Sequence, residues 1–454
     1  MIKRTLKEIQ EMVNGTGLNE KYESLVVEGV TINSREIEKG NLFIPIIGER
    51  VDGHTFVEGA IKSGAVATFW QKDHTDIPND IPVILVDDTE KALQKLATAY
   101  RNQLNFKIIG ITGSNGKTST KDILASILAT TFKVHKTQGN FNSEFGMPLT
   151  ILRAEEDTEV AVLEMGMRGI GQIALLSNIA RPDAAIITNI GEAHIEELGS
   201  RENISKAKME IVAGLKDDGI FVYHGDEPLL IDKVEQLNAP YRLETFGDST
   251  NNDYYPTSMK IENNGMVFTI PQVDFEFYLP VLGKHNVMNT LATIAVAHDL
   301  GVSYENIKKG LAALEMTKMR MELITAANGL TMINDAYNSS PTSVRATLDL
   351  LNSLTGYNKK IVVLADMLEL GEDEVSYHEE IGTYIDENEV DYVLTFGPLA
   401  KHIALKTKVK NAQSFDDKQA LVEKIKEIST DKDIALIKGS RGMRLEDVIE
   451  ALKK

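Results

Sequence analysis

A short glycine-rich segment, GSNGKTS at residues 113–119, has the residue types and spacing of a phosphate-binding loop. It follows an apolar, β-branched run at 106–112, which indicates a buried strand, and a helical pattern at 117–132 begins within it. Backbone amides at such a turn bind phosphate, the lysine reaches the outer phosphates, and the threonine hydroxyl can hold Mg²⁺. The residues predicted to bind the nucleotide are Gly113, Ser114, Asn115, Gly116, Lys117, Thr118 and Ser119.

The loop is shorter than the full Walker pattern, which has a glycine where this chain has Ile111. The shortened GxxGKT form is less specific, so its interpretation depends on the strand before it and the helix after it. The alternative is a glycine-rich helix start beside a surface lysine.

A carboxylate and an imidazole follow two other predicted strands. Glu164 ends the run VAVLE, and His194 comes shortly after the run AIITNI. The carboxyl ends of parallel strands meet at one edge of a sheet, where the phosphate loop also opens. Mg²⁺ prefers oxygen ligands and keeps several waters. We therefore expect one or two magnesium ions near Thr118, Glu164 and His194.

Predicted strands and helices alternate along most of the chain, and these elements must position the residues named above. This rhythm predicts an α/β protein with three domains. A small α/β domain spans 1–105, a central ATP-binding domain with a mostly parallel sheet spans 106–321, and a Rossmann-like domain spans 322–454. The strand-rich stretch at about 240–282 predicts a β insertion within the central domain.

Composition excludes several classes of protein. The 454 residues include no cysteine and carry a formal net charge of -19. Disulfide and cysteine chemistry are therefore excluded, which agrees with a reducing cytoplasm. The negative charge argues against a nucleic-acid-binding protein, and no window is apolar enough for a membrane span. We expect a cytoplasmic protein, and a monomer.

Eight segments, in this order over nearly the whole chain, resemble the motifs of the Mur ligase family. They are TGSNGKTST, TQGNFNSEFGMPLTIL, LEMGMRG, ITNIGEAHIEELGSRENISKAKMEI, LGKHNVMNTLAT, MRMEL, NDAYNSSPTSV and ADMLELGE. NDAYNSSPTS, DMLELGE and NIGEAHIEELGS most resemble members that add D-alanyl-D-alanine to UDP-N-acetylmuramoyl-tripeptide (UDP-MurNAc-tripeptide). A DNPR segment, typical of the ligase that adds diaminopimelate, is absent.

The resemblance implies a role for each matching residue, with ATP and Mg²⁺ as cofactors. Catalysis and metal binding would involve Lys117, Glu164, His194 and Lys208, and Lys208 matches the lysine that carries a carbamate. The nucleotide would contact Asn286, Asn289, Arg320 and Asp335 besides the loop. The UDP-peptide and the dipeptide would contact Ser34, Arg35, His54, Asn140, Asn142 and Asn338. Asn33 departs from the family, which often has Asp there.

The resemblance also implies a mechanism in which ATP converts the substrate carboxylate into an acyl phosphate that the amine of D-alanyl-D-alanine then attacks. The helix start at Ser340–Thr342 is a candidate for binding the dipeptide carboxylate. The general base and the third peptide residue, lysine or diaminopimelate, stay open. The alternatives are a sister ligase that adds one amino acid, a non-catalytic ATP-gated binding protein and a simple P-loop kinase.

Overall fold

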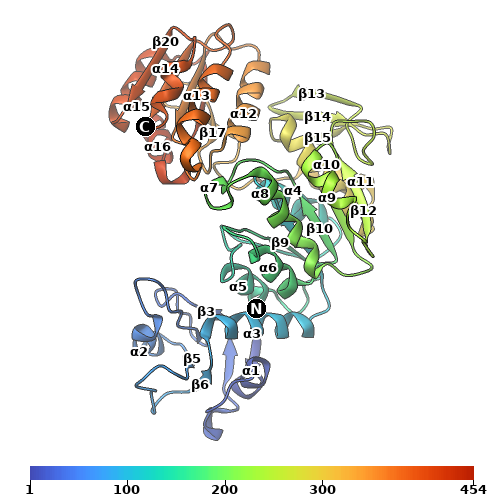
Figure 1. Cartoon of the computed structure of the whole chain (residues 1–454), viewed down its shortest axis with the longest axis vertical. Coiled ribbons are helices and arrows are strands. Elements are labelled where there is room, and N and C mark those ends of the chain that lie inside the picture. The colour runs from blue at the N-terminus through green and yellow to red at the C-terminus, as the bar shows by residue number, and fades with distance from the viewer.

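The computed structural model describes all 454 residues as three α/β units in a row, with the first and third units at opposite ends of the molecule (Figure 1). Each unit has its own largely parallel sheet. The predicted α/β class, with a β insertion and a Rossmann-like third part, is confirmed by this topology.

The first unit is built on a parallel sheet with strand order β3-β4-β5-β6. Its elements are β1 (Lys3–Thr5), α1 (Leu6–Val13), β2 (Val26–Glu28), β3 (Val30–Thr31), β4 (Leu42–Phe43), α2 (Val57–Lys62), β5 (Ala67–Gln71), β6 (Val83–Val86) and α3 (Thr89–Gln103). Helix α3 joins this unit to the next, since the buried Tyr100 hydroxyl donates to the Ala154 carbonyl oxygen at 3.0 Å.

The central unit is a six-stranded, fully parallel sheet with order β12-β11-β10-β7-β9-β8. Its elements are β7 (Lys107–Thr112), α4 (Lys117–Leu128), β8 (Val134–Lys136), α5 (Gly146–Arg153), β9 (Val160–Glu164), α6 (Gln172–Ala180), β10 (Ala184–Ile187), α7 (Ile195–Leu198), α8 (Arg201–Met209), β11 (Ile220–His224), α9 (Pro228–Val234) and β12 (Arg242–Phe246). Strand β7 lies between β9 and β10, so the loop after it is flanked by Glu164 and by the segment leading to His194.

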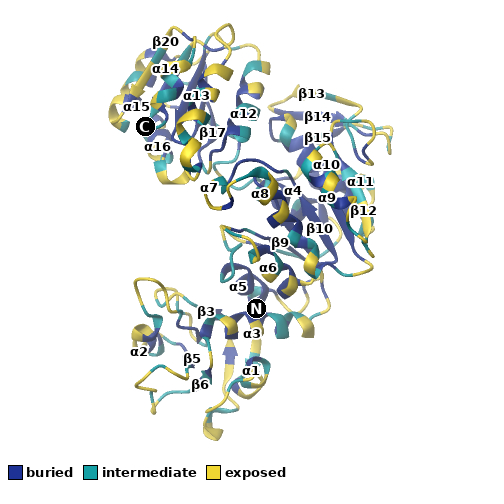
Figure 2. Ribbon diagram, in the orientation of Figure 1, coloured by how far each residue is buried: buried dark blue, intermediate teal, exposed yellow.

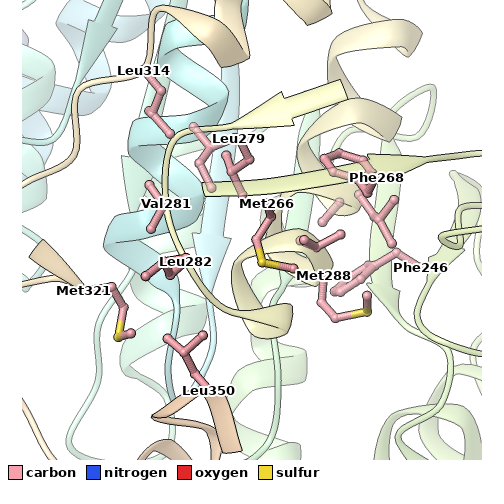
Figure 3. Close-up of a cluster of buried hydrophobic side chains, with 14 of the residues drawn as sticks. Phe246, Met266, Phe268, Leu279, Val281, Leu282, Met288, Leu314, Met321 and Leu350 are labelled. Atoms are coloured by element: carbon pink, nitrogen blue, oxygen red, sulfur yellow. The ribbon is translucent and has the colours of Figure 1, made fainter. Parts of the chain in front are cut away.

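The β insertion is an antiparallel sheet of β13 (Ser258–Glu262), β14 (Gly265–Thr269) and β15 (Phe277–Leu279). It begins later than expected, because β12 pairs in parallel with β11 and belongs to the central sheet. Two helices follow, α10 (Lys284–Asp299) and α11 (Tyr304–Ala312). Figure 3 shows Met266, Leu282 and Met288 from this region in one apolar cluster with Leu350 of the third unit. The central and third units thus share a core.

The third unit has a six-stranded sheet in the order β16-β17-β21-β18-β19-β20, parallel except for β16. Its elements are β16 (Glu322–Thr325), β17 (Thr331–Asp335), α12 (Pro341–Ser353), β18 (Lys360–Ala365), α13 (Glu374–Tyr384), β19 (Tyr392–Phe396), α14 (Lys401–Lys406), β20 (Asn411–Phe415), α15 (Lys418–Ile428), β21 (Ile434–Lys438) and α16 (Glu446–Leu452). The sequence pattern predicts only the four inner strands. Edge strand β20 is largely polar, and edge strand β16 has only four residues, half of them polar, which explains why periodicity misses them.

The inner strands of the central and third sheets are buried, whereas exposed residues lie on the outer turns of the covering helices (Figure 2). None of the helices combines the length and apolarity that a membrane span requires.

Candidate active site

A cavity of about 460 Å³ opens where the central unit faces the third unit. It is lined from the central unit by the phosphate loop and the ends of the neighbouring strands, and from the third unit by residues after β17. The predicted site residues that line it are Ser114, Asn115, Gly116, Lys117, Thr118, Asn140, Asn142, Glu164, His194, Arg320 and Asn338. The structure therefore brings together residues from six separate segments of the sequence.

A second cavity of about 260 Å³ adjoins the first and shares the phosphate loop. Among its lining residues are Ser119, Asn289, Asp335 and Lys438. Asn286 lies outside both cavities, because it is buried and its amide donates to the Leu282 carbonyl oxygen at 2.8 Å. The expected direct contact of Asn286 with the nucleotide therefore has no support in the structure.

The phosphate loop depends on two glycines with positive φ. Gly113 has φ +154°, and a Cβ there would lie 1.8 Å from Thr188 Oγ1. Gly116, at φ +82°, starts α4 and packs against Asn289. The Lys117 ammonium donates to the Gly113 carbonyl oxygen at 2.7 Å. Burial lowers the pKa of Lys117 to about 8.

Glu164 has the surroundings of a cation ligand. Its Oε1 atom is buried without a hydrogen bond, and its Oε2 atom lies 3.4 Å from Thr118 Oγ1 and 3.5 Å from Asn142 Nδ2. The Lys121 ammonium, 3.4 Å from Oε1, compensates the charge on that oxygen, and Oε2 stays directed at the Thr118 hydroxyl in the cavity. The oxygen-rich pair of Glu164 and Thr118 therefore fits the ligand preference of Mg²⁺.

His194 lies at the start of α7 in a left-handed conformation, φ 66°. Its Nδ1 is 3.1 Å from Glu369 Oε2 of the third unit, at ion-pair distance but without hydrogen-bond geometry. Glu369 also has a positive φ of 64°. Two residues in a rarely populated backbone conformation thus meet between the units, as is typical of functional sites.

Lys208 is 1% exposed on α8, whereas Lys206 on the same helix is exposed. Burial, and then the Lys117 ammonium, hold the pKa of Lys208 well below its usual value, and no carboxylate offsets these effects. The buried lysine therefore holds a proton less readily than an exposed lysine does.

The third unit reaches the loop through the start of α12. Ser340 Oγ lies 3.3 Å from Asn115 Oδ1, and the Glu192 carboxylate accepts hydrogen bonds from the backbone N–H and hydroxyl of Thr342 at 3.1 and 2.7 Å. The helix start at Ser340–Thr342, expected to bind a ligand carboxylate, is thus already capped by a carboxylate of the chain itself. That expectation is wrong for this arrangement of the units.

The predicted substrate contacts of the first unit lie beyond the carboxyl ends of its strands. Arg35 is exposed and Ser34 is half-buried, just after β3. His54 is different, because it is 4% exposed and both ring nitrogens already have partners. Neither ring nitrogen is free for a diphosphate, so the contacts of His54 support a role in shaping the loop.

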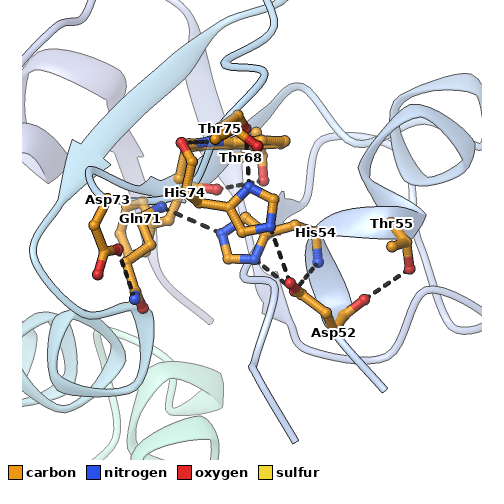
Figure 4. Close-up of polar contacts among 10 residues, drawn as sticks. Asp52, His54, Thr55, Thr68, Gln71, Asp73, His74 and Thr75 are labelled. Carbon is orange, nitrogen blue, oxygen red and sulfur yellow. Dashed lines mark hydrogen bonds and ion pairs between the residues drawn. The ribbon is translucent and has the colours of Figure 1, made fainter. Parts of the chain in front are cut away.

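His54 belongs to a cluster with Asp52 and His74 (Figure 4). Its Nε2 accepts from the Gln71 backbone N–H at 3.2 Å, so its proton is on Nδ1 and is donated to Asp52 Oδ1 at 2.7 Å. His74 lies between two acceptors, the Thr75 carbonyl oxygen and Asp52 Oδ2, each at 2.9 Å. Both contacts are hydrogen bonds only when both His74 nitrogens carry protons, so the arrangement favours the imidazolium form.

This proton arrangement argues against a metal in the cluster. A ligating histidine normally donates its other N–H to an acceptor. The other nitrogen of His54 faces an N–H donor instead, so coordination through Nδ1 would leave the ring without any proton. The cluster is instead a set of charged, hydrogen-bonded side chains that joins the segment after β4 to the segment after β5.

We expect His74→Gln to destabilise the protein by about 1 kcal/mol, and only at low pH. The hydrogen bond to Thr75, and then the Asp52 carboxylate, raise the pKa of His74, with Asp76 adding to the effect. A raised pKa adds stability below the unfolded value of about 6.5, and this stability is lost as pH rises through the folded value. Chemical denaturation of both proteins from pH 5.5 to 9 tests this, and an equal difference at all pH values would contradict it.

Sequence reasoning missed Lys121 and Asp122, which lie beside the site, and the pairing of Thr342 with Glu192. Lys121 follows Lys117 by four residues, so helical spacing alone places both on one face of α4. No comparable signal marks the pairing of Thr342 with Glu192, because the two residues are 150 positions apart in the sequence.

Family models match most of the chain. The Mur ligase family catalytic domain matches residues 26–101, the Mur ligase middle domain matches 111–297, and the Mur ligase glutamate ligase domain matches 319–441.

Individual relatives match over the full length. The chain is 49% identical to UDP-N-acetylmuramoyl-tripeptide--D-alanyl-D-alanine ligase of Bacillus subtilis, covering 100% of this chain and 99% of the relative. The Escherichia coli ligase of the same name is 31% identical at the same coverage. Among solved structures, MurF from Acinetobacter baumannii has a TM-score of 0.91 at 29% identity, covering 100% and 99%. MurF ligase from Thermotoga maritima in complex with ADP has a TM-score of 0.85 at 31% identity, covering 94% and 97%.

Proposed function

Because the chain belongs to the Mur ligase family, we propose that it joins D-alanyl-D-alanine to UDP-N-acetylmuramoyl-tripeptide at the expense of ATP, in peptidoglycan precursor synthesis. The sequence-based identification of the family and of a ligase is confirmed by the matches. The observation that carries the proposal is the 460 Å³ cavity, in which a phosphate loop, the buried Glu164 carboxylate and residues of the third unit meet.

We propose that ATP spans the two adjoining cavities. The loop amides and Lys117 would bind its phosphates, while Asn289, Arg320 and Asp335 would surround the nucleoside. Arg320 is held in place, since its guanidinium stacks 4.1 Å from the Tyr337 ring centroid and lies 3.4 Å from Thr118 Oγ1.

Glu164, Thr118 and His194 would hold Mg²⁺, which would neutralise charge on the transferred phosphoryl group. Lys208 would contribute as a carbamate, formed when its neutral Nζ attacks the carbon of CO₂ and releases a proton. The new carboxylate would supply a negative oxygen that an ammonium cannot. The burial of Lys208 near Lys117 supports this assignment.

The chain's own residues would support the reaction in two ways. First, Lys117 would stabilise charge on the γ-phosphoryl group while the substrate carboxylate becomes an acyl phosphate. Second, Asn338 of the third unit and Arg320 of the linker before it would close the cavity and keep water from the acyl phosphate until the dipeptide amine attacks. Asn140 and Asn142 line the same cavity and would position the peptide end of the substrate.

The remaining assignments are also proposals. Ser34 and Arg35 would bind the UDP moiety, with His54 shaping the loop behind them. The units would divide near residues 105 and 321, both of which fall between sheets. The protein would act in the cytoplasm as a monomer, without nucleic acid or membrane.

The direct test is phosphate release from ATP with UDP-N-acetylmuramoyl-tripeptide, with and without D-alanyl-D-alanine. We expect release to rise at least about tenfold with the dipeptide, because the acyl phosphate turns over only when the amine attacks it. Single amino acids serve as controls. Greater stimulation by a single amino acid would favour a sister ligase, and no stimulation by any amine would overturn the proposed reaction.

A further inference from the structure

Two consecutive residues of α4, Lys121 and Asp122, form a buried charged pair next to the candidate active site. Each is 2% exposed. The Lys121 Nζ atom lies 3.4 Å from Glu164 Oε1 and 3.5 Å from Asp122 Oδ1. Buried charges are costly unless they are paired, so this arrangement requires an explanation beyond solubility.

Lys121 and Thr118 contact opposite oxygens of the Glu164 carboxylate. Lys121 faces Oε1, and the Thr118 hydroxyl faces Oε2. An ammonium beside one oxygen fixes the carboxylate plane and leaves the other oxygen directed at the hydroxyl. Such partners behind a ligand are what orients a metal-binding carboxylate.

Asp122 makes the second connection, to the linker between the central and third units. Its Oδ2 accepts from the backbone N–H of Thr317 at 3.0 Å and from the Thr317 hydroxyl at 2.6 Å. Its Oδ1 accepts from Lys136 at 2.7 Å. Thr317 lies between α11 and β16, and Arg320, which lines the cavity, follows three residues later.

We propose that Lys121 and Asp122 are positioning residues that couple the metal-binding carboxylate to the interdomain linker through the rigid first turns of α4. Lys121 sets the orientation of Glu164, and Asp122 anchors Thr317 and hence Arg320. This inference rests on the proposed magnesium role of Glu164. The two contacts act separately, because Asp122 retains Lys136 when Lys121 is removed.

The test of Lys121 uses Mn²⁺ as a spectroscopic substitute for Mg²⁺. Binding of Mn²⁺ to the full-length protein in the presence of ADP is measured by electron paramagnetic resonance, a readout independent of turnover. We expect Lys121→Met to raise the Mn²⁺ dissociation constant at least about tenfold, the effect typical of losing a partner behind a metal ligand.

Lys360→Met is the matched control. Lys360 is also buried, at 9% exposed, and its ammonium lies 2.8 Å from Glu389 in the third unit. The Lys360→Met substitution should lower the Tm of the protein and leave its Mn²⁺ affinity unchanged. If Lys121→Met does not fold, Lys121→Gln keeps a neutral donor on a shorter side chain and should weaken Mn²⁺ binding by a smaller factor.

Glu164→Gln separates the two proposals. If it binds Mn²⁺ as tightly as the unmodified protein, the proposed metal role of Glu164 fails. If it weakens binding while the Lys121 variants do not, the positioning role alone is overturned.

The linker contact is tested with Thr317→Val, which removes the hydroxyl hydrogen bond at nearly constant volume. The chain has no cysteine, so Asp232→Cys and Lys426→Cys, both at exposed positions, allow specific spin labels on the central and third units. We expect Thr317→Val to broaden the distribution of label distances and to leave Mn²⁺ affinity unchanged. An unchanged distribution would overturn the anchoring role of Asp122.

Discussion

Lys117→Met is expected to reduce kcat at least about 10³-fold, equivalent to about 4 kcal/mol of transition-state stabilisation. The lysine is the cation of the phosphate loop, and phosphoryl transfer depends mainly on neutralising charge at the transferred group. In the structure its ammonium donates to Gly113 in its own loop. It therefore contributes little to packing, and the variant should fold.

The control for Lys117→Met is the affinity of the protein for the UDP-substrate, which we assign to the first unit. Binding of the UDP-substrate, measured by calorimetry without ATP, should be unchanged because Ser34 and Arg35 follow β3, in a different sheet. A variant that keeps normal kcat would show that this loop is not the ATP site. Loss of UDP-substrate binding as well would indicate misfolding instead.

The convergence of the loop with Glu164 and His194 at one cavity is the part of the site that the sequence predicts well. Gly116, Lys117 and Thr118 are adjacent in the chain, and the strand and helix around them have clear periodicity. Glu164 and His194 each follow an apolar strand, so the rule that parallel strands end at one edge predicts their meeting. These predictions succeed because local pattern determines both the element and its direction.

The contacts between units are not predictable in this way. Glu192 meets Thr342, and His194 meets Glu369, across long sequence separations. Their pairing depends on how the central and third units are oriented relative to each other, and sequence periodicity carries no information about that orientation. His54 was misassigned for a related reason, since its nearest partners, Asp52 and Gln71, come from two segments whose register is set by the sheet.

The proposed carbamate on Lys208 depends on both the sequence and the structure. On the sequence, Lys206 and Lys208 are two lysines of one helix, and an exposed helix lysine usually only solvates a surface. The structure separates them, because Lys208 is buried and Lys206 is exposed. A buried ammonium near Lys117 and a magnesium ion would be repelled by both, by several kcal/mol at about 4 Å and intermediate dielectric. A carbamate reverses the sign of that interaction.

Lys208→Ala is therefore expected to lower kcat by at least about 10²-fold, with partial recovery on addition of acetate or formate. A short carboxylate can occupy the space that the side chain leaves and replace the missing oxygen ligand. Lys206→Ala, on the same helix, should keep normal activity and show no response to either anion. A second measurement detects the modification itself, by ¹³C NMR after the protein is equilibrated with ¹³C-bicarbonate. A carbamate signal should appear in the unmodified protein and in Lys206→Ala, and disappear in Lys208→Ala. Full activity of Lys208→Ala would instead mean that the buried lysine only fills space in α8, and the carbamate assignment would fail.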